Sequence, residues 1–600
     1  RYEKNRASNG MEAEYKTGRR YTKHDRVISK KTMENSEDSK KEVSVARYLV
    51  SKIEELGIDT VPVIQGGAIM KMIDEVGESK KLHYICPNHE QALAMMVDAY
   101  ARIRGFGVGM VTSGPGATNL TTGIGCAYYD SIPCLFITGQ VGMFHVKGER
   151  GVRQRGFQET DVVSALKPIT KFAVLLDKGE DARYVFEKAV HIAKTGRPGP
   201  VVIDLPYNVQ REMINPETLR GYVPPEEEKE DKEKLEKETE EVLKKLYKAE
   251  RPLLLIGGGV RIAEKEKEIY EFVKKTELPV VTTWSAADMF PADVPLYLGN
   301  IGKSGNASAV KALQESDVLL CLGVRFTPRT IIHEKKFAVQ TEVIAVDIDR
   351  AELEEGIVNP HKKICCDLKE FVPMMMRCAN GKKMEREGWK RRLNELKAKE
   401  YVIHGSLEHS DGYVDPYLFI PMLFEEAPAN AVFIPEAGAN LIWVMQTYKL
   451  KRGQRIFSAW GNSPMGYALP AAIGARIANP NAPVIATIGD GGFQMNIQEL
   501  QTIAGNKIDV KIFILNNKCY GNIIIGATKE FQGRAHGNNA ETGYTAPDFV
   551  KVAKAYGIDT ETITDISEAR EKVRNILGRK GAVIVDVSIN PNQEHVELSL

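Results

Sequence analysis

Long apolar runs are absent from the sequence: no stretch reaches the roughly 18 consecutive apolar residues of a membrane-spanning helix. An excess of charge is absent too, because 81 lysines and arginines are balanced by 80 aspartates and glutamates, giving a formal net charge of +1. Such a chain has no overall field that would attract nucleic acid or an anionic membrane. We therefore expect neither as a partner, and the ligands must be inferred from individual sites.

Paired cysteines are missing as well. The eight cysteines form no CxxC pair and no zinc-ligand spacing, which predicts a reducing compartment and no disulfide framework. The first residues are polar, unlike a secretory signal peptide. We expect a soluble, cytoplasmic protein, in which residues 1–41, with few apolar residues and no sustained period, form a disordered tail.

What the sequence does contain is a repeated alternation of amphipathic helices and short apolar strands. The 600 residues exceed what one hydrophobic core holds. The alternation runs over 42–210, 241–375 and 413–600, interrupted by a charged linker at 211–240 and a charged linker helix at 376–412. Strands separated by helices predict parallel sheets covered on both faces. We therefore predict an α/β protein of three doubly wound parallel-sheet domains.

The most informative motif lies in the third domain. An apolar strand runs into Gly489-Asp490-Gly491, and the next strand ends on Asn516-Asn517. Ligands collect at the carboxyl ends of parallel strands, and Mg²⁺ takes one or two carboxylates or carbonyls together with water and phosphate oxygens. Either motif alone is equally compatible with a glycine turn or a polar strand end. Together they predict a magnesium site.

The spacing also carries a resemblance. GDG, 24 intervening residues and NN resemble the signature of thiamine diphosphate enzymes, and "FQMNIQEL" between them is similar to the acetolactate synthase branch. The resemblance implies a diphosphate-binding C-terminal domain whose metal ligands are Asp490, Asn517 and the backbone carbonyl of Cys519. It implies that Met465 bends the cofactor into a V shape. The other implied cofactor contacts are Gly438, Ala439, Asn440, Gly489, Gly491, Gly492, Tyr520, Gly521 and Asn522.

The first domain supplies the pyrimidine half of the resemblance. Glu90 in "CPNHEQAL" begins a predicted helix, where an acid also serves as an ordinary dipole partner. In the family this glutamate hydrogen-bonds the aminopyrimidine N1′ and so activates the thiazolium carbon. The resemblance further implies that Gly66 and Gly67 contact the cofactor, and that Gln140 in "TGQV" and the Phe157-Gln158 pair in "GFQETD" act on the substrate side.

The middle domain corresponds to the one that binds FAD in acetolactate synthases. Arginines and glycine amides suit a pyrophosphate, and acidic strand ends suit a ribose. Each glycine also fits an ordinary turn, and related enzymes hold FAD, ADP, another nucleotide or nothing here. We expect FAD as a third cofactor, and the residues implied for it are Arg197, Gly257, Gly258, Gly259, Gly299, Gly302, Arg325, Asp347, Asp349 and Asp367.

Several substrate-facing segments depart from the synthases. Pro206-Tyr207-Asn208 replaces a Pro-Lys-Asp, and Gln65 replaces the proline of the first loop. Residues 438–443 lack the usual Gln and His, and 520–538 lacks the tryptophan of the substrate channel. The cofactor motifs match while the acceptor pocket does not. The sequence therefore suggests an acetolactate synthase-like enzyme with a non-standard acceptor, such as a keto sugar.

The function implied by the resemblance is a thiamine diphosphate- and Mg²⁺-dependent carboligase. It would decarboxylate a 2-oxo acid, with pyruvate preferred, and transfer the acyl carbanion to a second carbonyl. A 2-oxo acid decarboxylase or C–C lyase on the same scaffold remains an alternative, as does a non-catalytic nucleotide-binding or regulatory homologue. The resemblance also implies a homodimer or homotetramer in which Glu90 of one subunit faces Asp490 of the next.

Overall fold

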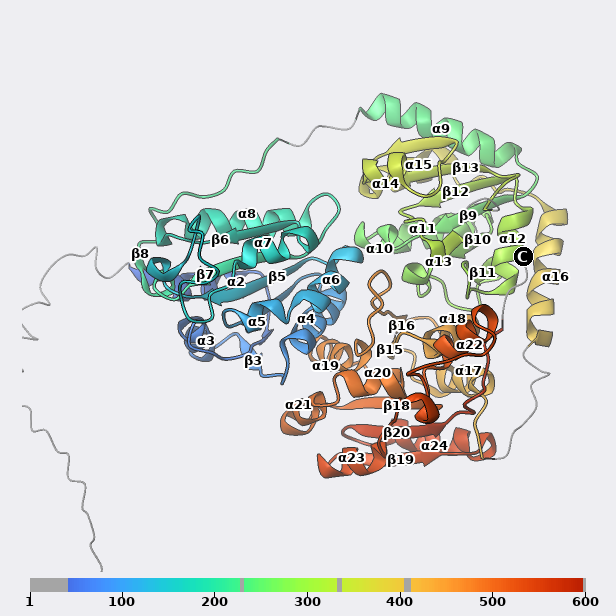
Figure 1. Cartoon of the computed structure of the whole chain (residues 1–600). Coiled ribbons are helices and arrows are strands. Elements are labelled where there is room, and N and C mark those ends of the chain that lie inside the picture. Colours follow the sequence, from blue (N-terminus) through green and yellow to red (C-terminus); the bar gives the residue numbers. More distant parts are fainter. Residues whose placement is uncertain (1–41, 227–230, 332–336, 404–411, 597–600) are drawn as a thin grey trace, which may run out of the picture.

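The computed structural model describes residues 42–226, 231–331, 337–403 and 412–596. The predicted tail at 1–41 lies outside this range. Figure 1 shows three α/β bodies in chain order: blue to cyan, green to yellow, and orange to red. Among the described residues, no helix combines the length and apolar composition needed to cross a membrane. The eight cysteines all lie in the described ranges, and none of them forms a disulfide.

The N-terminal body is built on a parallel sheet ordered β4-β5-β7-β6. The parallel pair β2-β3 is attached to it through a bridge between Val63 and Met110, whereas β1 and β8 pair antiparallel. The strands are β1 (Val43–Ser44), β2 (Thr60–Pro62), β3 (His83–Ile85), β4 (Gly107–Val111), β5 (Cys134–Gln140), β6 (Phe172–Leu175), β7 (Val201–Pro206) and β8 (Met213–Ile214). The helices are α2 (Val45–Glu55), α3 (Met70–Gly77), α4 (Glu90–Arg104), α5 (Pro115–Thr118), α6 (Thr121–Tyr129), α7 (Val162–Leu166) and α8 (Ala182–Lys194).

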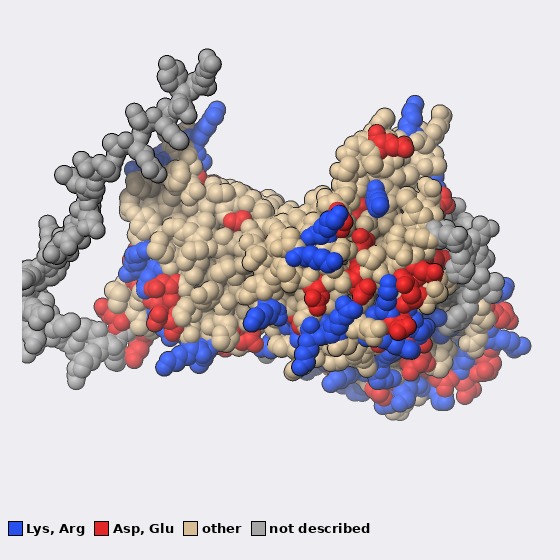
Figure 2. Space-filling view, turned by 90° about the horizontal axis from the view of Figure 1, so that it is seen from below, with Lys and Arg blue, Asp and Glu red and all other residues tan. Residues whose placement is uncertain are grey.

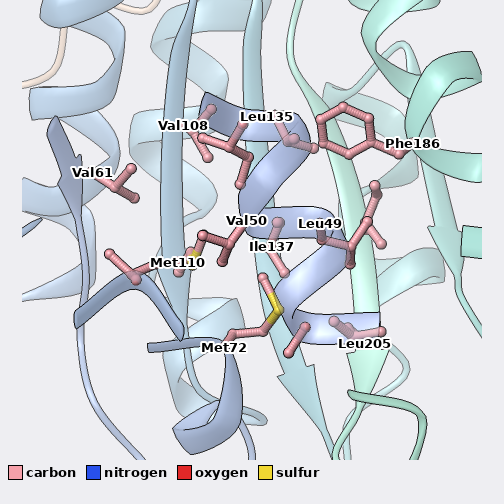
Figure 3. Close-up of a cluster of buried hydrophobic side chains, with 14 of the residues drawn as sticks. Leu49, Val50, Val61, Met72, Val108, Met110, Leu135, Ile137, Phe186 and Leu205 are labelled. Atoms are coloured by element: carbon pink, nitrogen blue, oxygen red, sulfur yellow. The ribbon is translucent and has the colours of Figure 1, made fainter. Parts of the chain in front are cut away.

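Both faces of this sheet are buried, which explains why its strands read as continuous apolar runs. Leu135 and Ile137 of β5 pack with α2, α3 and α8, and Figure 3 shows this cluster around Leu49 and Val50. Phe136, between them in sequence, points to the other face and packs with α4, α6 and α7. The alternation follows from the period of two in a strand.

The central body is a six-stranded parallel sheet ordered β11-β10-β9-β12-β13-β14. In chain order this is 3-2-1-4-5-6, the Rossmann arrangement, whose switch point lies between β9 and β12. The strands are β9 (Pro252–Ile256), β10 (Val280–Thr282), β11 (Tyr297–Asn300), β12 (Val318–Leu322), β13 (Glu342–Asp347) and β14 (Lys362–Cys365). The helices are α9 (Lys232–Lys248), α10 (Gly259–Ile262), α11 (Glu266–Thr276), α12 (Ala307–Glu315), α13 (Pro328–Ile331), α14 (Arg350–Glu355), α15 (Leu368–Ala379) and α16 (Glu387–Ile403).

The linker expected at 211–240 and the linker helix expected at 376–412 contribute helices to this central body (Figure 1). The later part of 211–240 belongs to α9, which buries Leu235 and Val242 against the sheet. Most of 376–412 belongs to α15 and α16, and α16 buries Trp389 and Leu393 on the opposite face. A few apolar residues at helical spacing are therefore enough to pack each helix against the sheet, although many of its residues are charged.

The C-terminal body is a six-stranded parallel sheet ordered β16-β15-β17-β18-β20-β19. In chain order this is 2-1-3-4-6-5, the order that the N-terminal body also follows once its bridge from β2 to β4 is included. The strands are β15 (Val432–Pro435), β16 (Arg455–Ile456), β17 (Val484–Gly489), β18 (Val510–Asn516), β19 (Asp559–Ile563) and β20 (Val583–Ser588). The helices are α17 (Pro416–Glu426), α18 (Ala439–Thr447), α19 (Ala468–Ala478), α20 (Asp490–Met495), α21 (Glu499–Asn506), α22 (Gly521–Glu530), α23 (Phe549–Ala555) and α24 (Ile566–Gly578).

The N- and C-terminal bodies pack through α4 and α19. A Cβ added to Gly474 of α19 would lie 2.3 Å from the backbone oxygen of Met96, so the two helices approach closely at this point. A buried polar network extends the contact: Arg102 pairs with Asp98 at 2.9 Å, and the hydroxyl of Tyr467 donates to Asp98 at 2.5 Å. The interface is therefore specific as well as apolar.

The charged surface agrees with the near-neutral composition. On the face that Figure 2 shows, basic and acidic side chains are intermixed, and a broad area carries few charged side chains. This face therefore presents no extended surface of a single sign.

Candidate functional site

The two motifs of the third domain meet at one sheet edge. Strands β17 and β18 are parallel neighbours with Gly489 opposite Leu515, so Asp490 and Asn517 leave the sheet side by side. Asp490 is 2% exposed and Asn517 is 5% exposed. This edge adjoins β15, and the chain order of the strands reverses between β15 and β17. It is therefore the crevice in which an α/β sheet binds its ligand.

The predicted metal ligands converge at this edge. The end of the Asn517 side-chain amide that faces them lies 3.1 Å from Asp490 Oδ1 and 2.9 Å from the backbone oxygen of Cys519. With its nitrogen turned inward, Asn517 donates a hydrogen bond to each; with its oxygen turned inward, three oxygens face one another. Ligands of an octahedral Mg²⁺ lie at about 2.0–2.1 Å from the ion, which separates neighbouring oxygens by about 3 Å. The set therefore fits Mg²⁺.

A tyrosine that sequence reasoning missed completes this cluster. The hydroxyl of Tyr544 donates to Asp490 Oδ2 at 2.9 Å. Burial raises the pKa of Asp490 to about 6, although the hydrogen bond from Tyr544 opposes this shift. The sequence analysis assigns Tyr544 no role, and only the contact reveals its place in the site.

Glycines in both loops are required by close packing. A Cβ on Gly491 would lie 2.3 Å from the ring of Tyr520 and 3.0 Å from the methyl group of Met465. A Cβ on Gly521, the first residue of α22, would lie 2.6 Å from the amide of Asn517. The backbone amides at the start of α22, whose second residue is Asn522, favour binding of an anion such as a diphosphate.

A buried glutamate supports the loops from below. Glu436 is fully buried after β15 and accepts hydrogen bonds from the backbone of Gly466 at 2.7 Å and Ala468 at 2.7 Å. A Cβ on Gly492 would lie 2.8 Å from its side chain. Burial raises the pKa of Glu436 to about 7, although the backbone hydrogen bonds act to lower it. Glu436 thus ties the Met465 turn to the Asp490 loop.

The remaining residues predicted in this domain surround the same edge. Gly438 has a φ of +95° and precedes α18, so it permits the turn that starts the helix. Ala439 is the first residue of α18. Asn440 is 3% exposed and donates to the backbone oxygens of Glu436 and Thr487 at 3.1 and 2.7 Å. Its side chain therefore links the end of β15 to β17.

In the N-terminal body, Glu90 is the first residue of α4, with His89 as its N-cap. Its carboxylate is partly exposed and accepts a hydrogen bond from Asn119 at 2.9 Å. The preceding Asn88 is anchored on the C-terminal body, because its backbone N–H lies 3.1 and 3.2 Å from the two carboxylate oxygens of Glu499. Within the described part of one chain, no hydrogen bond or ion pair joins Glu90 to Asp490.

The glycines expected near Glu90 differ in their packing. A Cβ on Gly66 would lie 2.4 Å from the side chain of Thr112, so the backbone there approaches β4 closely. A Cβ on Gly67 would meet nothing within 4 Å. Both follow β2 at the carboxyl end of the sheet, which is the edge where the cofactor's pyrimidine is expected.

Gln140 lies at the end of β5 and is 2% exposed. Its amide nitrogen donates to Asp204 Oδ2 at 2.9 Å and to the Thr160 backbone oxygen at 2.8 Å, and its oxygen accepts from Val141 at 2.9 Å. Burial raises the pKa of Asp204 to about 7. In this chain Gln140 is therefore fully engaged within the protein and positions the loop that carries Phe157.

That loop, residues 143–160, has a carboxylate at its centre. Glu159 accepts hydrogen bonds from the backbone of Lys147, Arg155 and Gly156. Burial alone would raise the pKa of Glu159, but these hydrogen bonds lower it. Phe157 is 86% exposed in the single chain, and Gln158 has a φ of +62° with its backbone against Gly114.

The central body contributes to a cavity of about 680 Å³ at its switch point, with walls from all three bodies. Six of the residues predicted to contact the nucleotide line it: Arg197, Gly258, Gly259, Arg325, Asp347 and Asp367. Among the described residues, the other four predicted contacts do not line it: Gly257, Gly299, Gly302 and Asp349.

These four have local roles instead. A Cβ on Gly257 would lie 2.0 Å from the backbone oxygen of Gly323, so the two strand ends touch. Gly299 and Gly302 have φ values of +101° and +119°, which favour glycine. Asp349 accepts a hydrogen bond from Arg197 at 2.9 Å.

The cavity suits an anionic nucleotide. Arg197 pairs with Glu352 at 2.7 Å, and Arg325 approaches the same carboxylate at 3.5 Å. Within the described ranges, the eight cations on the walls are Arg197, Arg325, Arg102, Arg104, Lys194, Arg261, Arg329 and Lys369, and they outnumber the six carboxylates Asp130, Glu264, Asp288, Asp347, Glu352 and Asp367. The indole nitrogen of Trp284, another lining residue, is buried without a hydrogen-bond partner in the described chain, so it offers a donor to a ligand.

Comparison with known proteins agrees with this arrangement. Residues 43–165, 239–375 and 436–587 match the N-terminal TPP binding domain, the central domain and the C-terminal TPP binding domain of thiamine pyrophosphate enzymes. The acetolactate synthase large subunit of Cyanidium caldarium is 36% identical over 87% of this chain and 89% of its own length. Acetolactate synthase 1 of Zea mays is 34% identical, over 92% and 86% respectively. The chloroplastic acetolactate synthase of Arabidopsis thaliana is 33% identical, over 92% and 82%.

Proposed function

The chain belongs to the family of thiamine pyrophosphate enzymes and resembles its acetolactate synthases; from this premise we propose that it is a Mg²⁺-dependent carboligase acting on pyruvate. It removes carbon dioxide from this 2-oxo acid and joins the acyl fragment to a second carbonyl compound. Thiamine diphosphate supplies the nucleophilic carbon and the electron sink for this chemistry when bound.

The observation that carries the proposal is the convergence of Asp490, Asn517 and the Cys519 carbonyl at one sheet edge. These groups would hold Mg²⁺, and the amides at the start of α22 would bind the adjacent diphosphate. Met465, held by the Glu436 turn against Gly491, would support the cofactor from below. A degenerate, non-catalytic homologue has no need to keep this set together.

Glu90 would manage the proton at the pyrimidine ring. The hydrogen bond from Asn119 fixes one oxygen of its carboxylate, which leaves the other oxygen for the ring nitrogen. A positioned carboxylate that exchanges a proton with the reacting group typically contributes 10²–10⁴-fold to a rate. Glu90 therefore has the role of a proton-transfer residue.

The acceptor is proposed to differ from that of the acetolactate synthases. Tyr207 stands where those enzymes have a lysine, and its ring packs edge-on against Phe144 with centroids 6.0 Å apart. The neighbouring Asn208 accepts a hydrogen bond from the backbone of Met143 at 2.9 Å, so it fastens the loop. An aromatic wall in place of a cation favours a less anionic acceptor, such as a keto sugar.

FAD is the proposed ligand of the cavity at the switch point of the central body. Arg197 and Arg325 would face its pyrophosphate and Asp347 a ribose, because all three line the cavity. The absorbance spectrum of the purified protein tests this: a flavin spectrum supports the assignment, and protein loaded with ADP or with no nucleotide contradicts it.

We also propose a homodimer or homotetramer. Phe157 of the loop 143–160 is 86% exposed in the single chain. This uncovered aromatic ring supports an active site completed by a second copy. Sedimentation analysis alongside activity checks this, because a monomer that remained fully active would contradict it.

The reaction is tested with ¹³C-labelled pyruvate, thiamine diphosphate and Mg²⁺, followed by NMR. Acetolactate, or a new acyl adduct when a keto sugar is added, is the expected product. Acetaldehyde as the sole product would instead indicate a decarboxylase. Calorimetry that detects no binding of thiamine diphosphate with Mg²⁺ would indicate the non-catalytic alternative.

A further inference from the structure

The second oxygen of the Asp490 carboxylate is held by its own partner. Oδ1 faces the Asn517 amide at 3.1 Å, whereas Oδ2 accepts a hydrogen bond from the Tyr544 hydroxyl at 2.9 Å. The Tyr544 side chain is 8% exposed, so water does not readily replace this contact. The two oxygens of one carboxylate thus have different neighbours.

The direction of the Tyr544 hydrogen bond is fixed by a third side chain. One atom of the Gln494 amide lies 3.1 Å from the Tyr544 hydroxyl and 3.3 Å from the backbone oxygen of Thr545. Because a carbonyl oxygen only accepts, this atom is the amide nitrogen. It donates to the hydroxyl oxygen, so the single hydroxyl proton of Tyr544 points to Asp490.

We propose that Tyr544 is a positioning residue that keeps Asp490 a one-oxygen ligand and thereby makes the metal site select Mg²⁺ over Ca²⁺. The proposal rests on the metal site of the proposed function. Mg²⁺ requires a near-ideal octahedron at 2.0–2.1 Å, whereas Ca²⁺ accepts two-oxygen carboxylate ligands at 2.3–2.6 Å with 6–8 ligands. The Tyr544 hydroxyl already takes one of the two lone pairs of Oδ2. It thereby makes Oδ2 a poorer metal ligand than Oδ1, which suits the first ion.

The ring of Tyr544 is held independently of its hydroxyl. It lies against the ring of Tyr520 with centroids 4.2 Å apart, and its backbone N–H donates to the Asn539 oxygen at 2.8 Å. Asn539 in turn forms a capping box with Thr542. Substitution of Tyr544 by phenylalanine therefore removes the hydroxyl while the ring and its turn stay in place.

The experiment compares metal binding by the full-length protein and Tyr544→Phe. Calorimetry at saturating thiamine diphosphate gives the Kd of Mg²⁺ and of Ca²⁺ separately. Loss of a partner behind a metal ligand typically weakens binding 10–100-fold, and we expect this for Mg²⁺ but not for Ca²⁺, which gains access to Oδ2. The ratio of the Ca²⁺ Kd to the Mg²⁺ Kd is expected to fall at least 10-fold.

Two further variants make the result decisive. Tyr556→Phe removes a hydroxyl from a partly buried tyrosine of the same domain and should leave the ratio unchanged. Gln494→Leu frees the Tyr544 hydroxyl to rotate and should lower the ratio by less than Tyr544→Phe does; it also provides the test if Tyr544→Phe does not fold. If the unsubstituted protein binds Mg²⁺ tightly but the folded variants keep the same ratio of the Ca²⁺ Kd to the Mg²⁺ Kd, only the role of Tyr544 is overturned and the metal site stands. Absence of metal binding by the unsubstituted protein overturns the proposed function itself.

Discussion

Buried carboxylates hold the loops around both halves of the thiamine site. Glu436, Glu499 and Asp204 are each 2% exposed or less. Glu436 and Glu499 accept hydrogen bonds from backbone N–H groups, and Asp204 accepts them from the side chains of Thr138 and Gln140. Because a buried carboxylate without partners is costly, each one favours a single loop geometry.

Substitution of Glu90 by glutamine tests the proton-transfer role. The amide keeps the size of the side chain but exchanges no proton, so we expect kcat to fall by 10²–10⁴ with little change in the affinity for thiamine diphosphate. Steady-state turnover of pyruvate and calorimetry give the two quantities. Glu78→Gln, an exposed change at the end of α3, should leave both unchanged. Full turnover by Glu90→Gln would contradict the assignment.

The pKa of Glu436 predicts a dependence of stability on pH. Because its folded pKa of about 7 lies above its usual value, the folded protein binds the proton more tightly than the unfolded chain does. The stability contribution is therefore fully present at acid pH and is lost as the pH rises towards 7. The parent's unfolding free energy minus that of Glu436→Gln should therefore fall by about 3 kcal/mol between acid pH and a pH above 7.

Melting temperatures of the parent and Glu436→Gln at pH 5, 6, 7 and 8 measure this effect. Other carboxylates titrate equally in both proteins and cancel in the comparison. We expect the advantage of the parent to shrink as the pH rises. Parallel curves would show that the hydrogen bonds to Gly466 and Ala468 keep Glu436 ionised throughout.

Residues of the site were predictable from sequence where they form a motif. The spacing from Asp490 to Asn517 brings both to one sheet edge, and the placement of Glu90 at a helix start follows from its context. Tyr544 and Glu436 were not predictable in this way, because each acts through contacts between segments that are distant in the sequence. An acid inside an apolar strand, such as Asp204, is a signal that sequence reading can use.

At the scale of elements, the strands were readable because both sheet faces are buried and the runs are apolar. The charged helices were harder: α9 and α16 show few apolar residues, yet these residues cover the central sheet. The packing of α4 on α19 was not predicted, since a helix pair between distant domains leaves no periodic signal. Its close approach depends on Gly474.

Gly474→Ala tests that helix pair. The added methyl group would lie 2.3 Å from the Met96 backbone oxygen, so we expect destabilisation of about 1–3 kcal/mol and a melting temperature lower by a few degrees. Gly526→Ala is the matched control, because a Cβ there meets nothing within 4 Å and alanine favours a helix by about 0.5–1 kcal/mol. Calorimetric melting measures both variants, and an equal or higher melting temperature for Gly474→Ala would contradict the close approach.

At the scale of the whole molecule, the cavity at the switch point is where the three bodies meet. Its walls include Arg102 of the N-terminal body, Arg325 of the central body and Trp460 of the C-terminal body. The strand order of the central sheet places its ligand site at this point. A ligand there contacts all three bodies, so its binding stabilises their arrangement and not one domain alone.

FAD is therefore expected to raise the melting temperature of the whole protein. A ligand at 100 times its Kd adds about 2.7 kcal/mol to the unfolding free energy. Arg325→Gln removes a cavity cation whose side chain also donates to the Tyr129 backbone oxygen at 3.3 Å, and it should weaken FAD and shrink the shift. The exposed Arg391 offers a matched control, since Arg391→Gln leaves the cavity unchanged. If FAD does not raise the melting temperature of the unsubstituted protein, FAD does not bind in the cavity. If FAD raises the melting temperature of Arg325→Gln as much as that of the unsubstituted protein, FAD binds at another site.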